Sequence, residues 1–115
     1  MTPEQTVLIE RIRTLILHET AVREVSMFGG RSVMVNEKMI ASALKGGDLL
    51  VRVDAARHDE LLDRAGATQA EMGLGRDMGP GWIEITADAI ADDKHLSSWI
   101  EVAMEHNRSA AHGHP

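Results

Sequence analysis

The sequence contains no cysteine and no tyrosine. Without cysteine the chain has no disulfides, no thiolate nucleophile and no cysteine-bound zinc, which suits a reducing cytoplasm. Aromatic side chains make up only 3% of the 115 residues, so we expect aliphatic residues and seven methionines to fill the core. Methionine suits this role because its flexible thioether tolerates irregular packing.

Long apolar runs are also missing. The longest, such as residues 15–17 and 49–51, fall far short of the roughly 20 residues that a membrane-spanning helix needs. Residues 1–10 include acidic and polar side chains and lack the basic and apolar regions of a signal peptide. We therefore expect a cytoplasmic protein without a membrane association.

A surplus of positive charge is absent, because 12 Lys and Arg stand against 18 Asp and Glu, for a net charge of −6. This balance opposes direct binding to nucleic acid, which requires phosphate neutralisation. Residues 31–57 are mildly basic, with five basic side chains (Arg31, Lys38, Lys45, Arg52, Arg57) against three acidic ones (Glu37, Asp48, Asp54). Direct nucleic-acid binding through this segment is an alternative, and a solvated sheet surface is the simpler interpretation.

The hydrophobic fraction of 43% and the charged fraction of 26% are ordinary for a globular protein. The sequence shows no internal repeat and no linker that would divide it. A chain of this length can bury one core. We predict a single domain over residues 1–108, followed by a flexible tail over residues 109–115.

Three helices are predicted. The first begins at Pro3, with Thr2 as its cap and Gln5 as the partner in a capping box, and its apolar stripe runs to about Thr20. The second runs from a cap at Asp54 to a stop at Gly66. The third opens at residues 92–93, where acids favour a helix start, and carries apolar side chains at helical spacing to Arg108.

Between and after these helices the apolar period changes to two, which is typical of strands. Four antiparallel strands follow residue 23, joined by turns at Gly29–Gly30, Asn36–Glu37 and residues 45–48. A short edge strand near residues 71–74 and a firmer strand at residues 82–85 come later, followed by a helical turn over residues 86–91. The predicted fold is α+β, in the order α-β-β-β-β-α-β-β-α, with an antiparallel sheet of about five or six strands and helices mainly on one face.

The order of short motifs along the chain resembles the TfoX N-terminal domain family. The residues that carry the resemblance are Met27, Phe28, Gly29, Gly30, Asn36, the strand end at residues 50–54, Gly81, Trp82 and the helix segment around Trp99. The resemblance implies a fold related to the secretion-chaperone-like α+β sandwiches and a structural role for these residues. In the better-known TfoX/Sxy relatives this domain is joined to a separate C-terminal domain, and the proteins regulate competence genes. Glu37 departs from the family pattern, because relatives usually have glycine after the asparagine of this turn.

The candidate catalytic and metal-binding residues of the sequence suit structural roles better. No nucleophile with a base and no paired carboxylates stand in a recognisable spacing. Residues 73–79 are glycine-rich, but their spacing does not fit a dinucleotide fingerprint and no helix follows them. Asp92, Asp93 and His95 suit a helix start better than a metal site, and His112 and His114 in the tail make a poor site. We assign no role to His58 or His106, and we expect no enzyme activity, cofactor or metal.

The second face of the sheet carries the one specific hypothesis. If the valines of the strands face the helices, Met34 and Leu50 point the other way, beside Arg52, and contiguous exposed apolar groups mark interaction surfaces. We expect this face to form a homodimer or to receive a protein partner, unless the last helix or a loop covers it. The predicted function is a non-enzymatic protein-interaction module that acts indirectly on transcription. A small-ligand carrier or an uncharacterised enzyme is a further alternative.

Overall fold

The computed structural model describes residues 1–27, 29–72 and 75–112. Its helices are α1 (Pro3–Leu15), α2 (His58–Leu62) and α3 (Asp93–His112), with short 3-10 turns at Ala55–Arg57 and Ala87–Ile90. Its strands are β1 (Val22–Met27), β2 (Gly30–Val35), β3 (Lys38–Ala43), β4 (Leu49–Arg52), β5 (Ala67–Gln69) and β6 (Trp82–Ile85). The strands form one antiparallel sheet in the order β1-β2-β3-β4-β6-β5. The predicted fold class and element order are confirmed.

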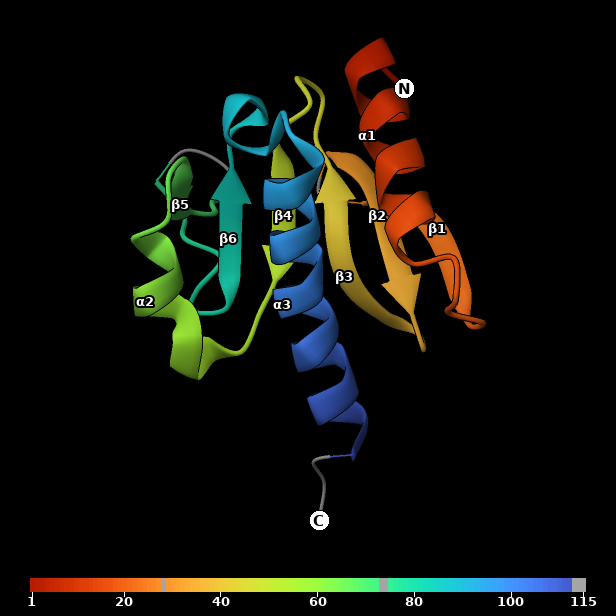
Figure 1. Cartoon of the computed structure of the whole chain (residues 1–115). Helices are drawn as coiled ribbons and strands as arrows, with labels where there is room; N and C mark the ends of the chain where they lie inside the picture. The colour runs from red at the N-terminus through yellow and green to blue at the C-terminus, as the bar shows by residue number, and fades with distance from the viewer. Residues whose placement is uncertain (28, 73–74, 113–115) are drawn as a thin grey trace.

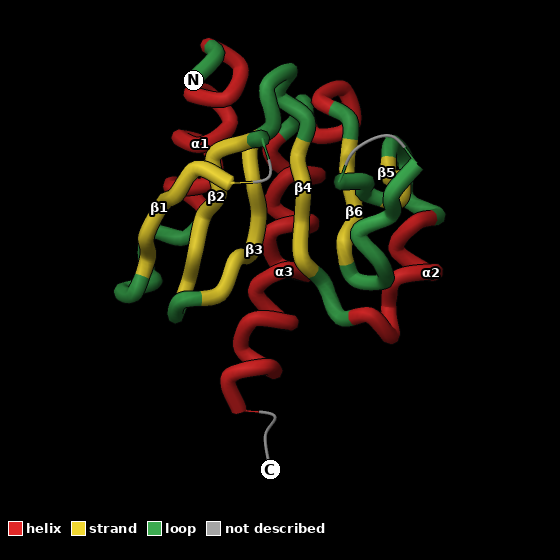
Figure 2. The backbone as a smooth tube through the Cα atoms, turned by 180° about the vertical axis from the view of Figure 1, so that it is seen from behind, coloured by secondary structure: helices red, strands yellow, loops and turns green. Residues whose placement is uncertain are grey.

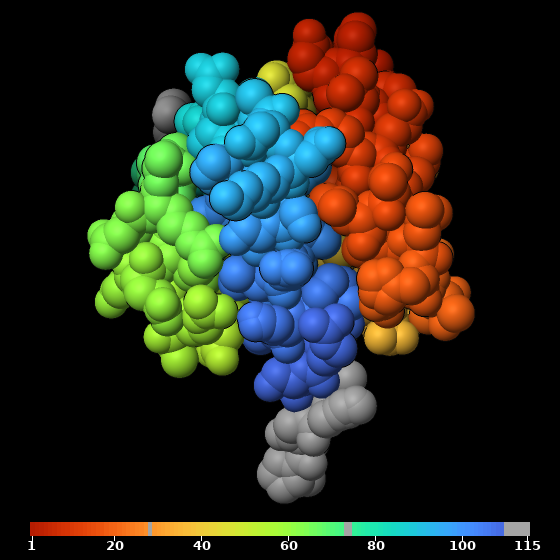
Figure 3. All heavy atoms as spheres, viewed as in Figure 1, coloured from red at the N-terminus to blue at the C-terminus, as the bar shows by residue number. Residues whose placement is uncertain are grey.

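All three helices lie on one side of the sheet. Helix α3 crosses it in the middle, with α1 toward β1 and β2 and α2 toward β5 and β6 (Figure 1). In the space-filling view α3 packs between the other two helices over most of this side (Figure 3). Seen from behind, the strands of the sheet are in view and the helices lie beyond them (Figure 2). We call this second side the open face. Within the described residues, no helix is long and apolar enough to cross a membrane.

The core lies between the sheet and the helices. Alternate strand residues point into it and are fully buried, and the apolar faces of α1 and α3 cover them; the central members are Ile12, Val33, Val35, Leu49, Val51, Ile83, Ile85, Leu96 and Trp99. Burial of each such aliphatic side chain stabilises the fold by about 1.5 to 3 kcal/mol. This core fixes the register of the strands and therefore decides which residues reach the open face.

The start of α1 agrees with its prediction. The Gln5 backbone N–H donates to the Thr2 hydroxyl, and the Thr2 N–H donates to the Gln5 side chain, which completes the capping box. The helix ends at Leu15, earlier than the predicted end near Thr20. Ile16 is the last apolar residue that reaches the core, since Leu17 is 78% exposed and the chain then turns toward β1.

The predicted edge strand near residues 71–74 is wrong in its described part, since residue 71 forms an isolated bridge and residue 72 lies outside any strand; residues 73–74 lie outside the described residues. The strand beside β6 is β5, which begins directly after α2 and pairs Ala67 with Ile85 and Gln69 with Ile83. Gly66 already occupies the sheet edge, because its carbonyl accepts a hydrogen bond from the Thr86 N–H. The strand therefore forms before the glycine-rich segment rather than inside it.

The end of α3 also differs from its prediction. The helix continues to His112, so residues 109–112 are helical. The rest of the predicted tail, residues 113–115 with His114, lies outside the described residues, as do Phe28 and residues 73–74. The last helix begins where the acids predicted it, since the Asp92 carboxylate accepts a hydrogen bond from the His95 N–H at 3.0 Å.

Candidate functional site

A row of side chains crosses the open face at mid-height. The strand pairings align Ser32, Ser42, Leu50 and Glu84 on neighbouring strands. The two serines are fully buried and their hydroxyls are 3.1 Å apart in a hydrogen bond. Leu50 is only 2% exposed although it points away from the helices. Something other than a helix must therefore cover this row.

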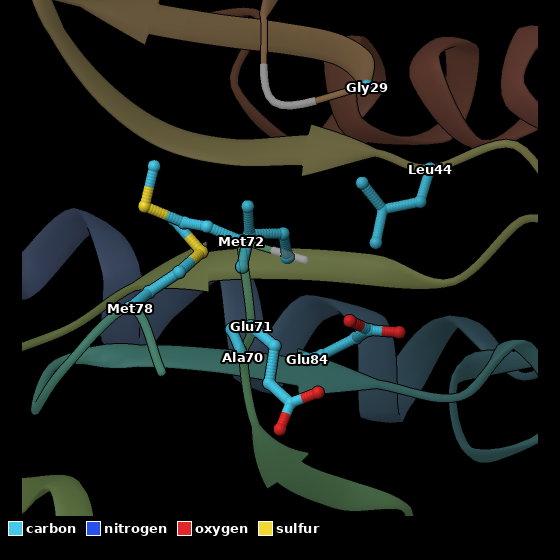
Figure 4. A pocket seen from close by; sticks show the side chains of 8 residues that line it. Gly29, Leu44, Ala70, Glu71, Met72, Met78 and Glu84 are labelled. Atoms are coloured by element: carbon cyan, nitrogen blue, oxygen red, sulfur yellow. The ribbon is translucent and has the colours of Figure 1, made fainter. Parts of the chain in front are cut away.

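Part of the cover, near Leu50 and Glu84, is a small hairpin between β5 and β6, of which the structure describes residues 70–72 and 75–78. The Met78 N–H donates to the Ala70 carbonyl and the Met72 N–H donates to the Arg76 carbonyl, each at 2.8 Å, and Glu71 bridges to Asp77. The hairpin brings the side chains of Met72 and Met78 in front of β4 (Figure 4). The described residues of this hairpin thus cover part of the open face.

One buried and one partly buried polar side chain fasten this hairpin to the sheet. His58, 6% exposed, accepts the Gly81 N–H on Nδ1 at 2.9 Å, so its Nε2 carries a hydrogen and donates to the Gln69 Oε1 at 2.8 Å. The Gln69 amide nitrogen lies within hydrogen-bond distance of the carbonyls of Ala70, Gly79 and Trp82. His58 is therefore a structural residue. Sequence reasoning missed this role, because its partners lie in another element.

Between the hairpin and the sheet lies a cavity of about 430 Å³, which we call the methionine groove. Its lining is mainly apolar and carries two acids: Gly29, Leu44, Leu50, Ala70, Met72, Met78, Glu71 and Glu84. Figure 4 shows the two methionines on one side of it and the two carboxylates on another. Met72 is 64% exposed, one of the most exposed large apolar side chains in the described part of the chain.

The electrostatics of the groove are negative. Burial raises the pKa of Glu84, and the nearby carboxylates of Asp48 and Glu71 raise it further. Among the described residues no cationic side chain pairs with Glu84. A half-buried carboxylate without a counter-ion gains from a positively charged ligand group, which would offset its repulsion from the other two acids.

The predicted interface residues are brought near this region, but they are not exposed. Met34 and Leu50 point away from the core as predicted, yet they are only 9% and 2% exposed. Of the two alternatives from the sequence, an exposed apolar face or a face covered by the last helix or a loop, the second holds for Leu50, near which the hairpin lies. Arg52 lies on the same face, with its guanidinium 4.6 Å from the centroid of the Trp82 ring. Whether the open face binds a partner stays a prediction.

The family motif residues have structural positions. A side chain at Gly30 would meet the Ala43 carbonyl at 2.6 Å, so glycine lets the β1–β2 turn approach β3 closely. Gly81 has a φ of 91° and would similarly meet the Val53 carbonyl at 2.8 Å. Trp99 is 2% exposed in the core, under the guanidinium of Arg64. Met27 and Gly29 border the β1–β2 turn.

The mildly basic segment does not form one stripe. Arg31 lies beside Glu24 at 3.5 Å, and Arg57 lies near Glu60 at 3.2 Å. Lys38 and Arg52 line one cavity, described below, while Arg31 and Lys45 line another. In the described ranges no group of three or more His, Asp or Glu side chains is placed to hold a metal ion.

Comparison with protein families now fixes the relationship of the chain. The model of the TfoX N-terminal domain matches residues 15–107, from the end of α1 to the last turns of α3. The chain belongs to the TfoX N-terminal domain family. The match covers the whole sheet, the hairpin and the groove, and it confirms the resemblance carried by the glycine and tryptophan motifs. No curated protein matched the chain.

Proposed function

We propose that this TfoX N-terminal domain protein is a non-enzymatic interaction module that binds a protein partner in the methionine groove. The occupant is an apolar segment that carries one lysine or arginine. One observation supports this most: exposed Met72 stands beside the unpaired carboxylate of Glu84, above an apolar floor.

The methionine groove has an apolar part and an acidic part, which suit the apolar residues and the basic residue of such a segment. Methionine side chains adapt to differently shaped apolar groups and are common at binding surfaces that accept varied partners. A long basic side chain can lay its apolar stem along the methionines and place its charged end at the carboxylates. The charge of Glu84 then orients the bound segment, and burial of Met72 contributes to its affinity.

Charge argues against a second copy of the chain as the occupant. A two-fold interface places the same surface on both partners, so a dimer through this groove would bring Glu71 and Glu84 of both copies together. Like charges across an interface cost several kcal/mol as an order of magnitude. A basic segment of another protein avoids this cost. A role in gene regulation would then act through a protein partner, which suits the net charge of −6.

Selection of peptides from a random phage-displayed library tests this function. We expect the selected peptides to share a basic residue flanked by apolar ones and to bind with micromolar affinity. Met72→Glu places a charge in the groove and should weaken binding at least tenfold, which corresponds to about 1.4 kcal/mol.

Leu17→Glu is the matched control, because Leu17 is 78% exposed and lies at the end of α1, away from the groove. It should leave peptide affinity unchanged. Selected peptides without a basic residue, or equal affinity for the two variants, would contradict the proposed function. A wild type that dimerises in sedimentation and loses the dimer in Met72→Glu would point to self-association instead.

A further inference from the structure

A second cavity lies at the other end of the sheet, where β3 begins, β4 ends and the last turns of α3 pass. Its volume is about 480 Å³, within the range of small-molecule sites. Its lining consists of Lys38, Met39, Arg52, Trp82, His106 and Asn107. We call it the basic pocket. It shares no lining residue with the methionine groove.

The charges around the basic pocket are mostly positive and uncompensated. Neither Arg52 nor Lys38 has a carboxylate within ion-pair distance among the residues that the structure describes. Burial lowers the pKa of His106, and the charges of Arg52 and Lys38 lower it further, against an opposing effect of Asp54. In a chain of net charge −6, this is a local concentration of cations that favours an anion.

Arg52 is already held in position. Its guanidinium carbon lies 4.6 Å from the centroid of the Trp82 ring, within cation–π distance, and a planar guanidinium directs its N–H groups outward in its own plane. A planar fork of donors suits the oxygens of a phosphate. Lys38, which is exposed at the start of β3, adds a mobile second charge.

Asn107, one of the residues that line this pocket, carries a polar atom without a hydrogen-bond partner among the described residues. Asn107 is 3% exposed, and its amide nitrogen donates to the Val35 carbonyl at 2.9 Å. Its Oδ1 is buried and has no hydrogen-bond partner within the described part of the chain. A buried acceptor left unpaired costs about 1 to 3 kcal/mol, so a ligand N–H that reached it would gain this amount.

We propose that the basic pocket binds a small ligand of the nucleotide class, with a phosphate, a flat ring and an N–H donor. Arg52 and Lys38 hold the phosphate. Met39 and Trp82 supply apolar contact for the ring, and Asn107 accepts the N–H. This site is additional to the methionine groove, and either can fail without the other.

Calorimetric titration with adenosine monophosphate, adenosine and inorganic phosphate tests the proposal. Because charge and ring both contribute, adenosine monophosphate should bind at least about tenfold more tightly than either fragment. In nitrogen-labelled protein the Trp82 indole N–H signal should shift during the titration. The Trp99 signal should stay, because this side chain is buried in the core.

Lys38→Gln and Arg52→Gln should each weaken binding about fivefold or more. Lys94→Gln removes the same charge at the far end of α3 and should leave the affinity unchanged. Lys38 and Lys94 are both exposed, so neither substitution should unfold the protein. Comparing the affinities of these two variants therefore tests the proposal even if the Arg52 variant unfolds.

Three results would overturn the proposal. One is no binding of adenosine monophosphate at millimolar concentration, and another is equal affinity in the Lys38 and Lys94 variants. The third is an affinity for short single-stranded oligonucleotides of one base type that rises with their length. This would indicate binding of a polyanion rather than of a small ligand.

Discussion

Glu37 adopts a backbone conformation that suits glycine. The turn between β2 and β3 has positive φ at both central residues, 54° at Asn36 and 64° at Glu37. This geometry matches the right-handed twist of the strands, and Asn-Gly is its preferred sequence. Glu37 keeps the turn at a steric cost, and its carboxylate pairs with Arg23 at 2.7 Å on the exposed surface. The departure from the family pattern therefore leaves the turn geometry unchanged.

Glu37→Gly should stabilise the protein by about 0.5 to 1 kcal/mol, because removing left-handed strain outweighs the loss of an exposed ion pair. Urea unfolding followed by circular dichroism measures this. Glu37→Gln keeps the strain and loses the pair, so it should be no more stable than the wild type. A gain of the same size in Glu37→Gln would show that strain is not the cause.

The charge of Glu84 should lower the stability of the fold and strengthen the binding of basic peptides. Burial and neighbouring acids raise its pKa in the folded state, so its charged form is disfavoured on folding. Protonated Glu84 therefore stabilises the folded state, and this contribution is complete only below the pKa of the unfolded state, about 4.3. It is lost as the pH rises through the pKa of the folded state. At pH 7 the wild type therefore carries the cost of the charge.

Glu84→Gln should consequently be more stable than the wild type at pH 7, by up to about 1 kcal/mol for a partly exposed group. The difference should vanish near pH 4, while binding of basic peptides weakens at pH 7. Thermal unfolding at several pH values tests the first part, with Glu101→Gln on the exposed side of α3 as a control. A Glu84 variant that is less stable at pH 7 would refute this assignment.

At the scale of elements, the hairpin over the open face depends on its anchor. His58 satisfies the Gly81 N–H and the Gln69 side chain at once. His58→Leu should cost about 1 to 3 kcal/mol, because it leaves both groups without this partner. His18→Leu, in an exposed turn before β1, should have little effect.

A His58 variant that remains folded should also bind groove peptides more weakly, because Met72 and Met78 would lose their fixed position. Peptide titration beside urea unfolding checks both effects. Unchanged affinity in a destabilised variant would show that the hairpin does not position the groove.

Most elements follow from local signals in the sequence. The capping box at Thr2, the alternation through β2 and β4, and the acids before α3 each determine nearby backbone through short-range contacts. The exceptions depend on packing. The end of α1 is set by the reach of Ile16 into the core, and the position of β5 by pairing with β6. Neither the end of α1 nor the position of β5 can be predicted from a short stretch of sequence.

At the scale of the whole molecule, the sheet has two faces with different covers. Strand alternation predicts that Met34 and Leu50 point away from the helices, and the structure agrees. Cover by a loop was one alternative from the sequence, but which loop covers Leu50 could not be predicted, because the position of the hairpin depends on a histidine and a glutamine in other elements. The groove and the basic pocket are likewise products of tertiary contacts, since Trp82 and Asn107 are distant in sequence.

Methyl-labelled methionine gives the most direct test of the methionine groove as the binding surface. On titration with a selected basic and apolar peptide, the methyl signals of Met72 and Met78 should shift together and saturate. The signal of Met104, 5% exposed against the core, should stay in place. A bound peptide that leaves the Met72 and Met78 signals unmoved would contradict binding in the methionine groove.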